Sequence, residues 1–159
     1  MPEMNTGAVD EHYMRLALEQ ARKAGAQDEV PVGAVVVCGD GGKETIIGTG
    51  SNRTRRMKDA TAHAEMVALR RAAENLGHWH FEGCTVYVTI EPCVMCAGAL
   101  VLSRVERLVF GALEPKFGGC GSIFDIVREK RLNHRLEVTG GVLESECAAL
   151  MKEFFRDKR

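Results

Sequence analysis

The sequence predicts an α/β domain in which helices cover both faces of a five-stranded sheet. Helical and strand patterns alternate along the chain in the order α-β-β-α-β-α-β-(α)-β-α. A length of 159 residues fits one domain, and neither a repeat nor an interdomain linker interrupts it. Hydrophobic residues make up 45% of the chain and charged residues 27%, which is typical of a folded protein rather than a disordered one. We therefore expect a single domain over residues 1–159.

The first half of the chain is expected to form a helix, a strand hairpin and a second helix. Asp10 is a candidate N-cap for a helix over residues 10–26, which carries an apolar stripe. The apolar run 30–38 predicts a buried strand, and a glycine-rich turn leads from it into a second strand over about 44–50. Apolar residues recur at helical spacing over 62–76, which predicts an amphipathic helix.

The second half continues the alternation. The β-branched, alternating stretch 84–90 predicts a third strand, and the proline at position 92 favours a helix start at 93–103. A fourth strand is expected at 105–111, followed by a glycine-rich loop, a short helix and a fifth strand near 135–139. The last helix should present one apolar face, formed by Leu143, Cys147, Leu150, Met151 and Phe154.

Charge and cysteine content limit the classes of function. A formal net charge of −1 excludes a globally basic nucleic-acid binder, although the basic run 53–58 allows a local basic surface. No apolar run is long enough for a membrane helix and no signal peptide is recognisable, so we expect a cytoplasmic protein without a membrane partner. Six cysteines in such a chain do not indicate a disulfide framework, and Cys84 and Cys147 are expected to be small core residues.

Two short motifs carry the chemistry, TAHAE at 61–65 and EPCVMC at 91–96. Cys93 and Cys96 are three residues apart in the first turn of a predicted helix, so both sulfurs lie on one side of it. The amino end of a helix also lowers the pKa of a thiol. His63, at the start of another helix, can supply a third ligand. One His and two Cys with an open fourth position form the pattern of a catalytic zinc site.

Glu65 lies two residues after His63, close to the expected metal without being one of its ligands. A zinc-bound water needs such a carboxylate to take its proton and deliver it elsewhere. An H-x-E motif followed by P-C-x-x-C characterises the zinc-dependent nucleobase deaminases, which include the adenosine deaminases of tRNA. The expected reaction is hydrolysis of an exocyclic C–N bond, in which Glu65 protonates a ring nitrogen and later the departing ammonia.

From about residue 11 to 159, the chain resembles the bacterial tRNA-specific adenosine deaminases, which convert the wobble adenosine, position 34, to inosine. The resemblance lies in the stretches EVPVGAVVV, SNR, TAHAEMVALR, TVYVTIEPCVMCAGAL, RLVFGA, LNHRLEV and GVLESECAALMKEFFR. It implies a cytidine deaminase-like, three-layer α/β/α fold with a mixed sheet and one Zn²⁺ per subunit. It also implies a homodimer whose partner is tRNA, usually the arginine tRNA with an ACG anticodon.

The resemblance also implies roles for individual residues. His63, Cys93 and Cys96 match the zinc ligands, and Glu65 matches the proton shuttle. The other matches are to positions that contact the target nucleoside or its neighbours in the anticodon loop: Asn52, Ala64, Val30, Pro31, Glu114, Lys116, Asn133, His134, Phe155 and Arg156. Phe154 matches as well, but its place on the apolar stripe favours a core position.

Three other functions use parts of the same pattern. A small-molecule deaminase of guanine or cytosine would need the zinc site but no RNA surface, and the matches at 133–134 and 154–156 favour tRNA instead. A non-catalytic, zinc-stabilised tRNA-binding subunit should lack the proton shuttle, yet Glu65 is present. A structural zinc module needs a fourth protein ligand, for which the sequence offers no convincing candidate.

Overall fold

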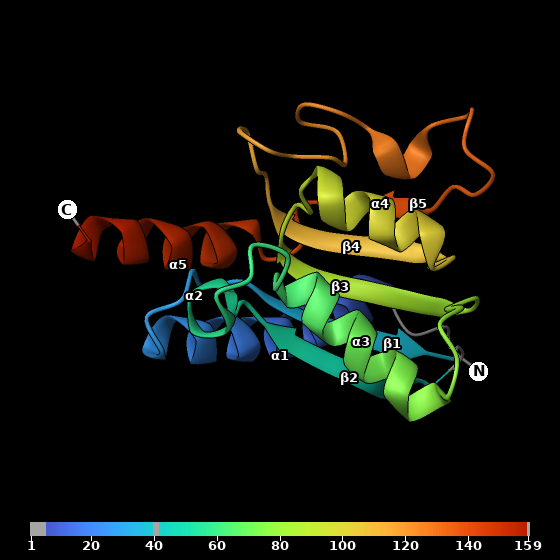
Figure 1. Cartoon of the computed structure of the whole chain (residues 1–159), viewed down its shortest axis with the longest axis horizontal. Coiled ribbons are helices and arrows are strands. Elements are labelled where there is room, and N and C mark those ends of the chain that lie inside the picture. The colour runs from blue at the N-terminus through green and yellow to red at the C-terminus, as the bar shows by residue number, and fades with distance from the viewer. Residues whose placement is uncertain (1–5, 40–41, 159) are drawn as a thin grey trace.

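The computed structural model describes residues 6–39 and 42–158, which form a five-stranded mixed sheet between two layers of helices (Figure 1). The strand order is β2-β1-β3-β4-β5, in which β1 is antiparallel to β2 and β3, and β3, β4 and β5 are parallel. The predicted fold class is thereby confirmed. The strands are β1 (Gly33–Cys38), β2 (Thr45–Ser51), β3 (Cys84–Ile90), β4 (Arg107–Ala112) and β5 (Glu137–Thr139).

Two apolar clusters hold the layers together, one on each face of the sheet. Alternate strand residues enter opposite clusters, as Val36 and Val35 of β1 illustrate, because successive side chains of a strand point to opposite faces. Helices α3 and α4 cover the first cluster, and α1 and α5 cover the second. The helices are α1 (Thr6–Ala26), α2 (Thr54–Met57), α3 (Ala64–Leu76), α4 (Val94–Leu102), the 3-10 helix η1 (Ile126–Arg128) and α5 (Glu144–Asp157). None of the helices within the described ranges is long and apolar enough to cross a membrane.

Asp10 does not cap the first helix, contrary to the prediction. The helix already begins at Thr6, and Asp10 lies buried inside it. Its carboxylate forms a bidentate ion pair with Arg107 of β4, at 2.7 and 2.8 Å, and accepts a hydrogen bond from the Tyr87 hydroxyl at 3.0 Å. A single sequence does not reveal this pairing, because Asp10 and Arg107 are 97 residues apart.

A disulfide joins Cys38 and Cys84, which the sequence did not predict. The two residues face each other in the antiparallel pairing of β1 with β3, with 4.1 Å between their Cα atoms. The next pair along the ladder is hydrogen-bonded, from Gly39 N to Gly83 O, so the cysteines occupy a non-hydrogen-bonded pair, where side chains come closest. Their juxtaposition depends on strand register rather than on chain spacing.

Two glycines of β2 let α3 approach the sheet closely. A Cβ atom at Gly50 would lie 2.4 Å from the carbonyl oxygen of Ala64, and one at Gly48 would lie 2.5 Å from that of Ala68. Any side chain at either position would push the helix away from the strand. This contact fixes the height of the first turn of α3 above the sheet, and that turn follows His63 directly.

Candidate metal centre and active site

Three predicted metal ligands come together where α3 and α4 begin. His63 is the N-cap residue of α3 and Cys93 that of α4, while Cys96 lies in the first turn of α4. The His63 Nδ1 atom is 3.5 Å from the Sγ atom of each cysteine, and one ligand atom from each residue lies within 4.8 Å of the other two. Within the described part of the chain, no fourth His, Cys, Asp or Glu joins this group.

The electrostatics of the three side chains fit a metal site. Hydrogen bonds from Cys96 and His63 to its sulfur lower the pKa of the Cys93 thiol to about 4. The pKa of Cys96 is raised, because Cys96 donates to Cys93 and is buried. The hydrogen bond to Cys93 raises the pKa of His63. One nitrogen and two sulfur donors, of which one thiol is already poised to ionise, suit a borderline-soft divalent metal ion that binds with release of protons.

Glu65 lies beside this cluster in the first turn of α3. Its side chain is only 4% exposed, and burial raises the pKa of its carboxyl group. It interacts electrostatically with His63 and by a hydrogen bond with Cys96. A buried carboxyl group with a raised pKa, next to metal ligands and open to a pocket, is suited to both accepting and donating protons.

A pocket of about 410 Å³ opens over the cluster. Seven residues predicted to contact substrate or metal, or to shuttle protons, line it: Val30, Asn52, His63, Ala64, Glu65, Cys93 and Glu114. The Asn52 side chain is buried, and its Oδ1 atom has no hydrogen-bond partner among the described residues. A buried acceptor without a protein partner is free to accept a hydrogen bond from a bound ligand or an ordered water. Pro31 is buried too, but it does not line the pocket.

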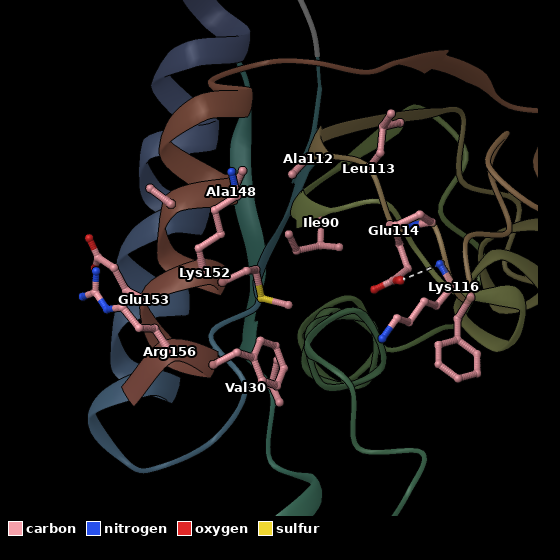
Figure 2. Close-up of a pocket in the computed structure, with 15 residues that line it drawn as sticks. Val30, Ile90, Ala112, Leu113, Glu114, Lys116, Ala148, Lys152, Glu153 and Arg156 are labelled. Carbon is pink, nitrogen blue, oxygen red and sulfur yellow. Dashed lines mark hydrogen bonds between the residues drawn. The ribbon is translucent and has the colours of Figure 1, made fainter. Parts of the chain in front are cut away.

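A larger groove of about 910 Å³ adjoins this pocket and runs between α5 and the loop after β4 (Figure 2). Val30, Ile90 and Met151 line both cavities, so the pocket opens directly into the groove. The groove also contains the predicted residues Glu114, Lys116, Phe155 and Arg156, together with Phe117 and Lys152, which sequence reasoning missed. Lys152 follows Met151 on the last helix, but helical spacing alone does not show which face borders a groove.

Asn133 and His134 lie elsewhere. His134 Nε2 is 2.7 Å from the carbonyl oxygen of Val105, which precedes β4, whereas the pocket lies beyond the carboxyl ends of β3 and β4. Within one chain these two residues therefore sit at the opposite end of the sheet from the metal ligands.

Phe154 is not a core residue, contrary to the prediction. It is half-buried and belongs to neither apolar cluster, since the last turns of α5 extend past the sheet (Figure 1). Its ring meets Phe155 edge-on, with centroids 5.3 Å apart, and Lys158 Nζ lies 5.4 Å from its centroid. Within the basic run 53–58, Thr54–Met57 form the short helix α2.

Comparison with known proteins agrees with this geometry. A family model of MafB19-like deaminases matches residues 9–159. The tRNA-specific adenosine deaminase of Bacillus subtilis is 47% identical over 150 residues, which cover 94% of this chain and 91% of the relative. That of Haemophilus influenzae is 49% identical, covering 94% of this chain and 85% of the relative.

Solved structures give the same result. A structure from a study of A-to-I editing by tRNA:A34 deaminases superposes with a TM-score of 0.82 at 43% identity, covering 87% of this chain and 98% of that one. A guanine deaminase from Nitrosomonas europaea has a TM-score of 0.77 at 30% identity, covering 91% of this chain and 83% of that one. The extent and identity of these matches establish that the chain belongs to the family of tRNA-specific adenosine deaminases.

Proposed function

We propose that the chain hydrolytically deaminates adenosine at the wobble position, 34, of a tRNA anticodon and so produces inosine, using one zinc ion per subunit. One observation carries the proposal: a His-Cys-Cys cluster and a buried glutamate form the floor of a pocket that opens into a groove with cationic and aromatic side chains. A pocket of about 410 Å³ is of the size that binds small ligands, and here it would take a single flipped nucleoside.

His63, Cys93 and Cys96 would hold the zinc ion, since their donor atoms are one nitrogen and two sulfurs within reach of one another. When bound, zinc lowers the pKa of a water molecule and so supplies the nucleophile of the hydrolysis. The Glu65 carboxylate would take one proton from the attacking water and deliver it to N1 of the adenine ring as the C6–O bond forms. It would then take the second proton, from the new C6 hydroxyl, and deliver it to the amino group as the C6–N6 bond breaks, so that ammonia leaves and inosine remains.

Residues around the pocket would hold the nucleoside. Asn52 has a buried Oδ1 atom that needs a donor, which a ribose hydroxyl can supply. The backbone N–H of Ala64 and the side chain of Val30 border the same cavity and would contact the base. Pro31 is buried outside the lining of the pocket and would act only indirectly.

The groove would hold the nucleotides that flank the target. Lys116, Lys152 and Arg156 can neutralise phosphates, and the exposed rings of Phe117 and Phe155 can stack on splayed bases. Glu114 borders both cavities and can accept hydrogen bonds from a neighbouring nucleotide. An adenosine in a loop is flipped more cheaply than a paired one, which suits an anticodon substrate.

We further propose that the chain acts as a homodimer. Helix α4 is apolar on its outer side as well as its inner side, with Val94 exposed and Leu102 76% exposed. Ile123 and Phe124 add exposed apolar area. A helix that is apolar all round is normally covered, and a second subunit would cover this one. A role for Asn133 and His134 in RNA binding would then need the second subunit, because in their own chain they lie far from the pocket.

The site of action would be the cytoplasm, where tRNA is modified, and the expected substrate is the arginine tRNA with an ACG anticodon. The test is to incubate purified protein with an unmodified transcript of that tRNA and, in parallel, with free guanine, cytosine and adenosine. Inosine at position 34, read by sequencing and absent with Glu65→Ala, supports the proposal. Ammonia from a free base without inosine in tRNA would instead indicate a small-molecule deaminase, and binding without any deamination would indicate a non-catalytic subunit.

A further inference from the structure

A buried carboxylate lies beneath the loop that forms one wall of the groove. Glu91 follows β3 directly and is only 2% exposed. Its Oε1 atom accepts hydrogen bonds from the Glu114 N–H, at 3.1 Å, and from the Ser122 hydroxyl. Its Oε2 atom accepts the N–H groups of Cys120, at 3.1 Å, and Ser122, at 3.0 Å. All four donors belong to the loop 114–122.

These four bonds occupy the accepting capacity of the carboxylate. A carboxylate has about four lone-pair positions, two on each oxygen. Glu91 therefore offers no free acceptor to a substrate, although it borders the pocket. The Glu91 carboxylate binds backbone N–H groups and one hydroxyl, and none of these groups changes its protonation during the reaction. Its position next to the metal-binding motif thus serves the loop.

Two glycines bring the loop against the metal-binding motif. A Cβ atom at Gly118 would lie 2.4 Å from Glu91 Oε2, and one at Gly119 would lie 3.0 Å from the carbonyl oxygen of Cys93. Gly119 N donates to Pro92 O at 2.8 Å. The loop therefore packs directly against residues 91–93, because neither glycine has a side chain that would separate them.

The loop 114–122, fixed in this way, forms one wall of the groove. Glu114 and Lys116 project from it toward α5, and the Glu114 carboxylate accepts the Lys116 N–H at 2.9 Å (Figure 2). Phe117 follows and is largely exposed. A second buried carboxylate fixes the other side of the pocket in the same way. The fully buried Glu29 carboxylate accepts hydrogen bonds from the N–H groups of Arg55 and Arg56, each at 2.9 Å, in the helix that follows Asn52.

We propose that Glu91 is a positioning residue for RNA, whose carboxylate fixes the loop 114–122 so that Lys116 and Phe117 meet the nucleotides flanking the target adenosine. The inference rests on the proposed function, since it assigns the groove to RNA. Glu91 acts through the loop and takes no part in proton transfer. Its loss should therefore weaken binding of the RNA and leave the chemical step unchanged.

The test compares three variants with the wild type on an anticodon stem-loop RNA. Glu91→Gln keeps the shape but turns an NH₂ group toward an N–H donor, and we expect KM to rise by about tenfold to a hundredfold. We expect kcat to stay within about threefold, because no reacting group is lost. Ser122→Ala removes one of the four donors and should raise KM by less. Glu82→Gln, on an exposed residue before β3, is the matched control and should change neither constant.

A second readout does not depend on activity. In the wild type, amide hydrogen exchange over 114–122 should be slow, and it should quicken in Glu91→Gln and, to a smaller extent, in Ser122→Ala. If Glu91→Gln does not fold, the kinetic and the hydrogen-exchange measurements are both made on Ser122→Ala. Zinc content per chain should equal that of the wild type in every folded variant.

Several results would overturn the inference. A fall in kcat at constant KM would make Glu91 catalytic, and loss of zinc would make it part of the metal site. Unchanged KM despite faster exchange would show that the loop does not hold RNA. No inosine from the wild type would overturn the proposed function and with it the RNA role of the loop, whereas the exchange data would still decide whether Glu91 holds the loop.

Discussion

Replacing Glu65 with Gln should remove deamination while leaving the metal site intact. The side chain is 4% exposed and enclosed beside the metal ligands, so an isosteric amide fits where the carboxyl group fits. The amide cannot carry a proton from water to the base. A positioned acid–base group contributes about 10²–10⁴-fold in rate, which is about 3–5 kcal/mol of activation free energy. We expect the upper end, since the same carboxyl group would act on both the ring nitrogen and the ammonia.

The assay is single-turnover conversion of the wobble adenosine in a tRNA transcript, with enzyme in excess. Zinc content is measured by mass spectrometry on the same samples. Glu74→Gln is the matched control, because it makes the same chemical change at an exposed position of the same helix. A Glu65→Gln variant that keeps more than about a tenth of the rate would refute the shuttle role. A variant that loses its zinc would show instead that Glu65 supports metal binding.

The same substitution should stabilise the metal-free protein. Burial raises the pKa of Glu65, so the folded state binds its proton more tightly than the unfolded state does. The contribution of this group to stability is then greatest below the unfolded pKa of about 4.3 and declines as the pH rises above it. At pH 7 Glu65→Gln should therefore unfold at a higher temperature than the wild type, with the two curves converging in acid. A lower midpoint at pH 7 would contradict the assigned direction.

Three further predictions concern stability. Asp10→Ala removes the carboxylate that pairs with the Arg107 guanidinium and leaves it only the Thr139 hydroxyl, so the free energy of unfolding in urea should fall by about 3 kcal/mol, whereas a change below about 1 kcal/mol would mean that the ion pair contributes little to stability. The Cys38–Cys84 disulfide links positions 46 residues apart, so its reduction should lower the unfolding free energy by up to about 4 kcal/mol, and identical urea midpoints with and without reductant would contradict this. Burial raises the pKa of the Cys147 thiol to about 12, so its stabilising contribution should be complete below about pH 8.5 and be lost as the pH rises from there to 12. At pH 8, iodoacetamide should modify Cys147 only after unfolding, and a label mapped to Cys147 in the native protein by peptide mass spectrometry would count against this.

The layers and the metal ligands were predictable because both depend on short-range patterns. Helical spacing over 62–76 reflects the face that α3 buries, while the β-branched stretch 84–90 is a strand buried on both faces, and both elements are present in the structure. The His63, Cys93 and Cys96 cluster needs only that two helices begin side by side, which the sheet order provides.

Features that depend on distant pairings were not predictable from one sequence. The sequence around Asp10 predicts a helix cap, and only the position of Arg107 in the fold shows that Asp10 forms an ion pair instead. Glu91 is part of the metal-binding motif, yet its hydrogen bonds depend on the irregular loop 114–122, whose conformation cannot be predicted from hydrophobic periodicity. Phe154 follows the apolar stripe of its helix, but the stripe continues past the point where the sheet ends. In each case the missing information is where a distant segment of the chain lies relative to the residue.

The close contact of β2 with α3 has a consequence for any attempt to reshape the pocket by directed evolution. Because the atoms that would collide with a new Cβ at Gly48 or Gly50 are mainly backbone atoms of α3, trimming a neighbouring side chain cannot relieve the collision. The helix would have to move as a whole, and His63 and Glu65 would move with it relative to the cysteines of α4. Variant libraries should therefore leave these two glycines constant and seek new base preference in Val30, Asn52 and the groove residues, whose side chains can change without displacing a metal ligand.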